Sequence, residues 1–122
     1  GEDLVFTTAG FATKGSALEA FDKAFEQKYG NAPESIYSAV GYDLIKVIEA
    51  AVIVAGSTEP KKIRDAMADL ENVQGATGLI TYKGTNGMPV RQVSLIRVKD
   101  GGRELVGQPS PDANLIPAPR MQ

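Results

Sequence analysis

Residues 34–56, ESIYSAVGYDLIKVIEAAVIVAG, decide how the chain folds. On a helix, their aliphatic side chains cover well over half of the circumference. Asp43, Lys46 and Glu49 recur at roughly helical spacing and mark the one face that is predicted to meet water. A helix of this kind lies buried between a sheet and other helices, so the rest of the fold has to supply that cover.

Two further helices flank this stretch. Ser16 opens the first with a capping-box pattern, and Gly30 is placed to end it. Ser57 or Thr58 caps the second, with Pro60 in its first turn. The inner stripes of the two helices consist of Leu18, Phe21, Phe25 and Tyr29, and of Ile63, Ala66, Met67 and Leu70.

The predicted strands are few and short. They cover residues 4–8, 79–82, 90–99 and 103–106, and the last two pair as a hairpin through Asp100-Gly101-Gly102. Residues 107–122 hold four prolines without periodicity and are predicted to form a tail on the surface. The helices thus outnumber the strands that should lie between them, and the sheet that would cover residues 34–56 is missing.

The composition excludes several classes of function. At 122 residues the chain fits one small domain, and its net charge of −2 with dispersed Lys and Arg gives no footprint for nucleic acid or an anionic membrane. The absence of Cys and His removes thiol nucleophiles, imidazole acid–base catalysis and the usual zinc sites. No signal peptide or membrane span is visible, and the opening GEDLVFTTAGF is typical of the interior of a longer protein.

Few residues suggest a site. The glycine-containing segments 75–78 and 84–87 lack the spacing of phosphate loops, and Asp65, Asp69 and Glu71 are interpreted as a solvated helix end rather than a metal site. We therefore expect neither a cofactor nor an enzymatic activity. Tyr37 begins the apolar helix, where its ring either reaches a ligand crevice or packs at the rim, and Tyr42 is predicted to lie in the core.

Five motifs in a fixed order carry a resemblance to a known family. They are F-x-x-x-Y-G-x-x-P at 25–33, Y-x-A-x-G-Y-D at 37–43, A-G-S-T-x-P-x-K-I-R-D-A at 55–66, G-x-T-G-x-I-T-Y at 75–82 and V-K-D-G at 98–101. The closing LIPAP at 115–119 fits as well. Together they resemble the C-terminal third of periplasmic substrate-binding proteins of ABC importers, of the type that binds leucine, isoleucine and valine.

The resemblance implies an α/β fold that is a fragment of the two-lobe type I periplasmic-binding-protein fold. Three helices, a few strands and a C-terminal hairpin would make up the fragment. Residues 1–11 would be a strand and crossover, 12–90 the helices and strand of one lobe, 91–106 a crossover with the hairpin, and 107–122 the tail. The missing sheet would belong to the part of such a protein that precedes Gly1.

The same resemblance implies a function. The full protein would capture branched-chain or related amino acids in the periplasm by lobe closure and deliver them to a membrane permease. Tyr37 would wall the side-chain pocket, while Thr7, Thr8 and Phe11 match the crossover beside the cleft. The charged anchors of the ligand would precede Gly1, so this chain alone is not expected to bind fully. Its bare helix face predicts an oligomer or a swapped dimer.

Two other readings remain open. The chain could be the ligand-sensing module of a receptor or regulator with the same fold, which a neighbouring signalling segment would support. It could also be an autonomous small α/β domain of unrelated purpose, which would have to fold as a monomer against the shortage of strands noted above.

Overall fold

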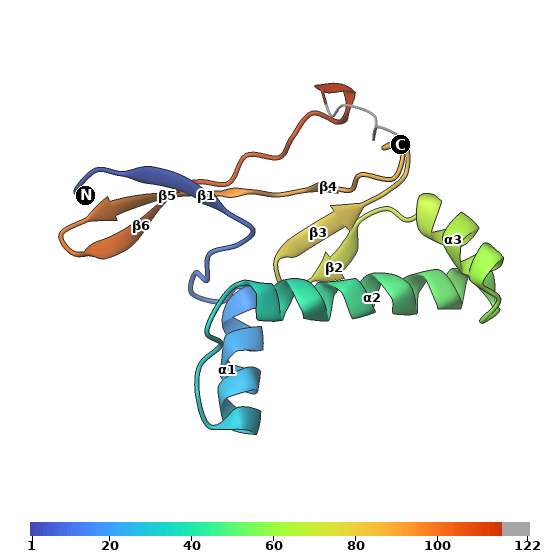
Figure 1. The fold of residues 1–122 in the computed structure, drawn as a ribbon, viewed down its shortest axis with the longest axis horizontal. Helices are drawn as coiled ribbons and strands as arrows, with labels where there is room; N and C mark the ends of the chain where they lie inside the picture. Colours follow the sequence, from blue (N-terminus) through green and yellow to red (C-terminus); the bar gives the residue numbers. More distant parts are fainter. Residues whose placement is uncertain (116–122) are drawn as a thin grey trace.

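The computed structural model describes residues 1–115 and confirms the α/β class (Figure 1). Residues 116–119 of the closing LIPAP motif lie outside the described part. The helices and strands of the described residues are β1 (Val5–Thr8), α1 (Ala17–Tyr29), α2 (Tyr37–Ala55), α3 (Pro60–Ala68), β2 (Val73–Gly75), β3 (Gly78–Thr81), β4 (Val90–Arg91), β5 (Ser94–Lys99), β6 (Gly102–Gly107) and the 3-10 turn η1 (Ala113–Leu115).

Within residues 1–115 the strands form two antiparallel three-stranded sheets, ordered β1-β5-β6 and β2-β3-β4. The predicted hairpin is present: Lys99 pairs with Gly102, and Asp100 and Gly101 take φ of 51° and 73°, as a two-residue turn of this kind requires. The expectation of one continuous strand over residues 90–99 is wrong. The chain leaves β4 of one sheet and enters β5 of the other through Gln92 and Val93.

α1 begins and ends where its sequence predicts. The Ser16 hydroxyl accepts the backbone N–H of Glu19 at 3.1 Å, and Gly30 closes the helix with φ of 80°. The helix meets α2 through Phe21, whose ring centre lies 5.4 Å from that of Tyr42. Tyr42 was expected in the core, but it is 45% exposed because it borders an open hollow between α1, α2 and β2.

α2 and α3 pack on the β2-β3-β4 sheet. The buried cluster consists of Val47, Ala51, Leu70 and Ile80, and the predicted inner stripe of α3 packs against it through Ile63, Ala66 and Met67. The residue that precedes α3 at its N-cap is Glu59, while the Ser57 hydroxyl accepts the Glu59 backbone N–H at 3.1 Å. The predicted packing of this helix is confirmed, and its predicted cap lies one to two residues early.

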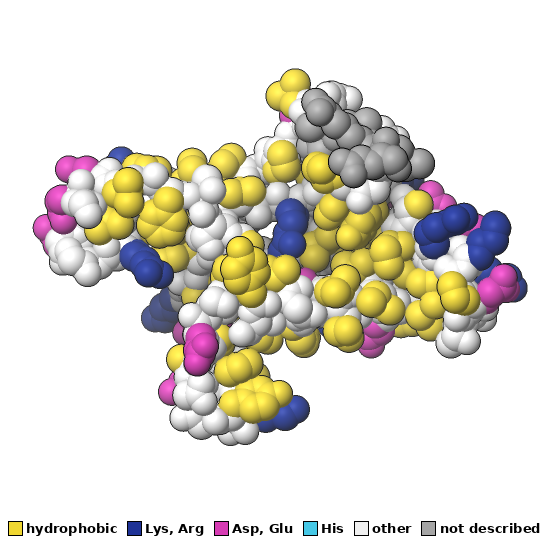
Figure 2. All heavy atoms as spheres, in the orientation of Figure 1, with side chains coloured by type: hydrophobic (Ala, Val, Ile, Leu, Met, Phe, Trp, Pro, Cys, Tyr) yellow, Lys and Arg dark blue, Asp and Glu magenta, His cyan; other side chains and the backbone are white. Residues whose placement is uncertain are grey.

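The prediction of a wet face on α2 is wrong for Asp43. This residue is 1% exposed and lies in the buried stripe Ala39, Asp43, Val47 and Ala51, which repeats every four residues. The small sheet covers only that one stripe of α2, so the exposed side chains of the helix are largely apolar. The large apolar side chains exposed on α2 are Tyr37, Tyr42, Leu44, Ile45, Ile48, Ile53 and Val54. Figure 2 shows hydrophobic side chains gathered along this helix.

The molecule has two halves: the β1-β5-β6 sheet, and a helical half made of α1, α2, α3 and the β2-β3-β4 sheet. Three segments lie where these halves meet. Residues 9–16 lead from β1 into α1, and residues 92–93 lead from β4 into β5. Thr8 and Ser94, which adjoin these two segments, are paired in the β1-β5 ladder. The chain after β6 runs back beside them, since the Val93 N–H donates to the Pro109 carbonyl at 3.1 Å. In Figure 1 the β1-β5-β6 sheet therefore projects to one side of the helices.

Candidate ligand groove

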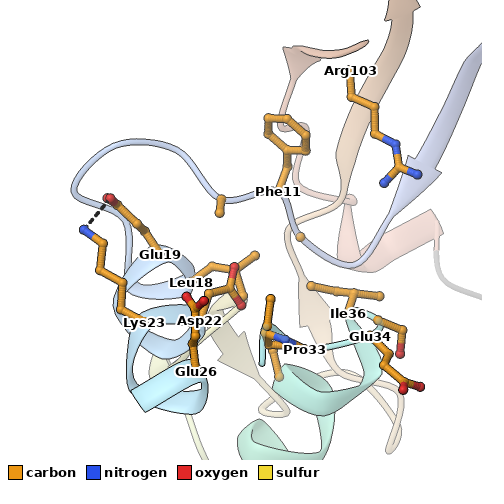
Figure 3. A pocket seen from close by; sticks show the side chains of 15 residues that line it. Phe11, Leu18, Glu19, Asp22, Lys23, Glu26, Pro33, Glu34, Ile36 and Arg103 are labelled. Atoms are coloured by element: carbon orange, nitrogen blue, oxygen red, sulfur yellow. Dashed lines mark ion pairs between the residues drawn. The ribbon is translucent and has the colours of Figure 1, made fainter. Parts of the chain in front are cut away.

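A groove of about 350 Å³ lies between the projecting sheet and the helices (Figure 3). We call it the Phe11 groove. Residues 10–12 and Arg103 of β6 line one side, and α1 with residues 32–36 lines the other. Its floor is apolar, because Leu18 and Ala39 are buried there and Ile36 is half-buried.

Gly10 lets the chain pass close over this floor. A Cβ atom at Gly10 would lie 3.1 Å from Leu18 Cδ2 and 3.3 Å from Ile36 Cδ1, closer than most carbon contacts in proteins. A side chain here would require the ends of Leu18 and Ile36 to move by a few tenths of an ångström. Glycine at this position therefore suits the close contact between residue 10 and the floor of the groove.

Charged groups line the rim of the groove. Glu19 pairs with Lys23 at 2.7 Å and accepts the Gly15 backbone N–H at 2.6 Å. Both hydrogen bonds lower the pKa of Glu19, and the bond from Lys23 has the larger effect. Burial has the opposite effect on Asp22, whose pKa it raises.

Arg103 lines the opposite wall of the groove. Its side chain extends from β6 toward the groove (Figure 3), and none of the ion pairs formed within residues 1–115 includes it. Glu34 and Glu26 also line the groove. An apolar floor between a guanidinium and several carboxylates suits a small molecule that carries both charges and an apolar group.

The structure brings together only part of the predicted site. Phe11 lines the groove and is half-buried. Tyr37 directly follows the lining residue Ile36 and is 77% exposed, and Thr8 ends β1 opposite Ser94, but neither is among the described residues that line the groove. Their roles as ligand contacts stay predictions.

Sequence reasoning missed Arg103 and Asp22 as groove residues. Asp22 falls on the polar side of α1 in any helical projection, which is typical of a solvated face. Arg103 follows a hairpin turn, and nothing local indicates which way its side chain points. Only the position of the hairpin relative to α1 could have identified them.

None of the helices within residues 1–115 is long and apolar enough to cross a membrane. In the same part of the chain, no group of three or more acidic residues is arranged to hold a metal ion, and the sequence has no His or Cys to contribute.

Comparison with protein families gives one match. A family model described as periplasmic binding protein matches residues 1–103. Among curated proteins, none matches the chain.

Solved structures give closer detail. The chain is similar to the leucine binding protein LivK from Thermotoga maritima, with 30% identity over 88% of this chain and a TM-score of 0.70. It is also similar to a protein from Rhodospirillum rubrum named as a candidate branched-chain amino acid ABC transporter, with 25% identity over 86% of this chain and a TM-score of 0.74.

A third structure shares the fold. It is the solute binding protein of an ABC transporter from R. palustris in complex with benzoate, with 23% identity over 90% of this chain and a TM-score of 0.69. The chain spans 31% of the length of each of these three proteins.

Proposed function

Since the chain belongs to the periplasmic binding protein family, we propose that it forms the C-terminal part of a protein that captures branched-chain or related amino acids. The observation that carries the proposal is the Phe11 groove, which lies where the two halves of the molecule meet. Relatives named for leucine and for branched-chain amino acid transport support the ligand class. Capture would proceed by closure of the two halves on the ligand.

Individual residues would have distinct roles. Phe11 and Ile36 would contact the apolar side chain of the amino acid, and Tyr37 and Thr8 would lie at the edge of the closed site. Arg103 would attract the ligand carboxylate, and the carboxylates of α1 would attract its ammonium group. Because the relatives are about three times longer, further anchors would come from outside these 122 residues.

Calorimetry tests this proposal. Leucine, valine and benzoate are titrated into this chain alone and into the chain extended by the coding sequence upstream of Gly1. We expect the extended protein to bind an amino acid and the 122-residue chain to bind it weakly or not at all. A reading frame that starts at Gly1, or an extended protein that binds none of these ligands, would refute the proposal.

A matched pair of variants tests the groove within the extended protein. Phe11→Ala removes a ring that lines the groove, and Phe25→Ala removes a half-buried ring of α1 outside it. We expect the first to weaken binding and the second to leave affinity unchanged. Equal losses in the two variants would place the ligand elsewhere.

The proposed location and partners follow from the same premise. The protein would act in the periplasm and deliver its ligand to the permease of an ABC importer. In this chain alone, the exposed aliphatic face of α2 would pack against a second copy. Light scattering is expected to show an oligomer that Ile45→Glu dissociates, and a monomer at high concentration would contradict this.

A further inference from the structure

A buried carboxylate fastens three elements together beside the crossing at residues 92–93. Asp43 of α2 accepts the backbone N–H groups of Ala76 and Thr77, at 2.5 Å and 3.1 Å, and also the Thr77 hydroxyl. Arg91 of β4 donates through Nη2 to that same hydroxyl, and its Nη2 lies 3.5 Å from the Asp43 carboxylate. The Thr77 hydroxyl thus donates to one charged group and accepts from the other.

Arg91 is the last residue of β4 before the chain crosses to the projecting sheet. Its side chain is 27% exposed and that of Asp43 is 2% exposed, so the pair is largely shielded from water. Hydrogen bonds between charged groups in such surroundings hold their geometry more firmly than exposed ion pairs do. The near end of the crossing is therefore fixed to α2 and to the β2–β3 turn.

The other crossing also lies against Thr77. A Cβ atom at Gly10 would lie 3.6 Å from Thr77 Cβ, so residues 9–16 pass beside the same turn. Thr8 and Ser94 are paired just beyond the two crossings. Both connections therefore leave the helical half from one small region, centred on Thr77.

We propose that Asp43, Thr77 and Arg91 form a clamp that fixes the pivot between the projecting β1-β5-β6 sheet and the helical half. With Arg91 held, bending between the halves falls on Gln92 and Val93, on residues 9–16 and on the chain after β6. Without the clamp, β4 would be held only by its pairing with β3, and the sheet would sample a wider range of orientations. The clamp is a positioning device, and its action does not depend on the identity of a ligand.

One atom of the clamp indicates a cost in stability. Among the described residues, Arg91 Nε is the only buried side-chain polar atom without a hydrogen-bond partner. A partly buried guanidinium that leaves its buried Nε donor unsatisfied is a poor way to gain stability, because desolvation offsets the attraction. An arginine here is better explained by the geometry that it imposes on the crossing.

Pairs of nitroxide labels measure the pivot directly. The chain has no Cys, so each engineered pair is unique within one copy, and dilution with unlabelled protein removes distances between copies. Thr58→Cys with Glu104→Cys spans the two halves, and Thr58→Cys with Gln27→Cys lies within the helical half as a control. All three positions are exposed. The distance distribution of each pair is recorded by double electron–electron resonance, first with Asp43, Thr77 and Arg91 unchanged and then in three variants.

Thr77→Val removes the hydroxyl at constant size, Arg91→Met removes the guanidinium, and Thr77→Ser keeps the hydroxyl. We expect the first two to broaden or shift the Thr58/Glu104 distribution and to leave the control pair unchanged, while Thr77→Ser preserves both. Where Thr77→Val does not fold, Arg91→Met decides. Any of three results would overturn the proposal. The Thr58/Glu104 distance distribution could stay unchanged in Arg91→Met, or both label pairs could broaden equally. The Thr58/Glu104 distribution could also broaden as much in Thr77→Ser as in Thr77→Val.

Discussion

Gly75 lies directly under the Asp43 carboxylate, and its replacement by alanine is the sharpest stability test that the structure offers. A Cβ atom at Gly75 would lie 2.5 Å from Asp43 Cγ, 2.5 Å from Oδ1 and 2.8 Å from Oδ2. These distances are well inside van der Waals contact, so the carboxylate has to move. The chain at Gly75 belongs to β2 and is paired with Gly78, which limits how far the backbone can yield instead.

The size of the effect follows from what the carboxylate leaves behind. Displacing Asp43 breaks its bonds to the buried N–H groups of Ala76 and Thr77, and an unsatisfied buried group costs about 1–3 kcal/mol. Alanine restricts the unfolded chain more than glycine does, which returns about 0.4–1 kcal/mol. The two groups together cost about 2–6 kcal/mol, and subtracting about 1 kcal/mol for alanine leaves an expected loss in the free energy of unfolding of about 1–5 kcal/mol for Gly75→Ala.

Gly41 provides the matched control. It lies inside α2, and a Cβ atom there would meet nothing within 4 Å. Gly41→Ala is therefore expected to raise the free energy of unfolding by about 0.5–1 kcal/mol through helix propensity alone. The free energy of unfolding of both variants is measured in urea titrations, with circular dichroism as the signal. A Gly75→Ala chain within about 0.5 kcal/mol of the parent would refute the close approach of Asp43 to β2.

Three further predictions concern α1 and its groove. Ser16→Ala removes the hydroxyl that caps α1 and should lower the free energy of unfolding by about 1 kcal/mol in urea titrations, whereas Ser16→Asp should retain most of it. Because burial raises the pKa of Asp22, the folded state binds its proton more tightly than the unfolded state, so stability should fall as pH rises from the unfolded to the folded pKa. Asp22→Asn should remove this fall in the free energy of unfolding with pH, as measured by urea unfolding at several pH values. An unchanged dependence on pH would contradict the burial of this carboxyl. Arg103→Gln in the extended protein should weaken amino acid binding in calorimetry, and equal binding would exclude the guanidinium from the site.

Features set by neighbouring residues were predictable from the sequence. The cap at Ser16, the glycine that ends α1 and the Asp100-Gly101 turn each depend on backbone geometry within a few residues. The inner stripe of α3 was predictable because nine residues already show helical periodicity. The family was predictable because ordered motifs span most of the chain, and the family match confirms it.

Features set by distant partners were not predictable. Asp43 was assigned to a wet face because its spacing from Lys46 and Glu49 suits solvent, but its partners lie more than thirty residues further along the chain. The break between β4 and β5 carries no Gly or Pro, so the strand pattern runs through it unmarked. Phe11 entered the candidate site through resemblance alone, and Arg103 joins the groove only once the hairpin is placed.

The pairing of β1 with β5 has a consequence for the order in which the protein is made. Val5 pairs with Arg97, so β1 has no partner within this chain until β5 has been synthesised. α1, α2 and α3 have their contacts within the intervening residues and can fold in the meantime. Until translation reaches β5, β1 is an unpaired edge, open to pairing with another nascent chain. Within this chain, the interval between the synthesis of β1 and that of β5 is therefore the period in which β1 is open to mispairing.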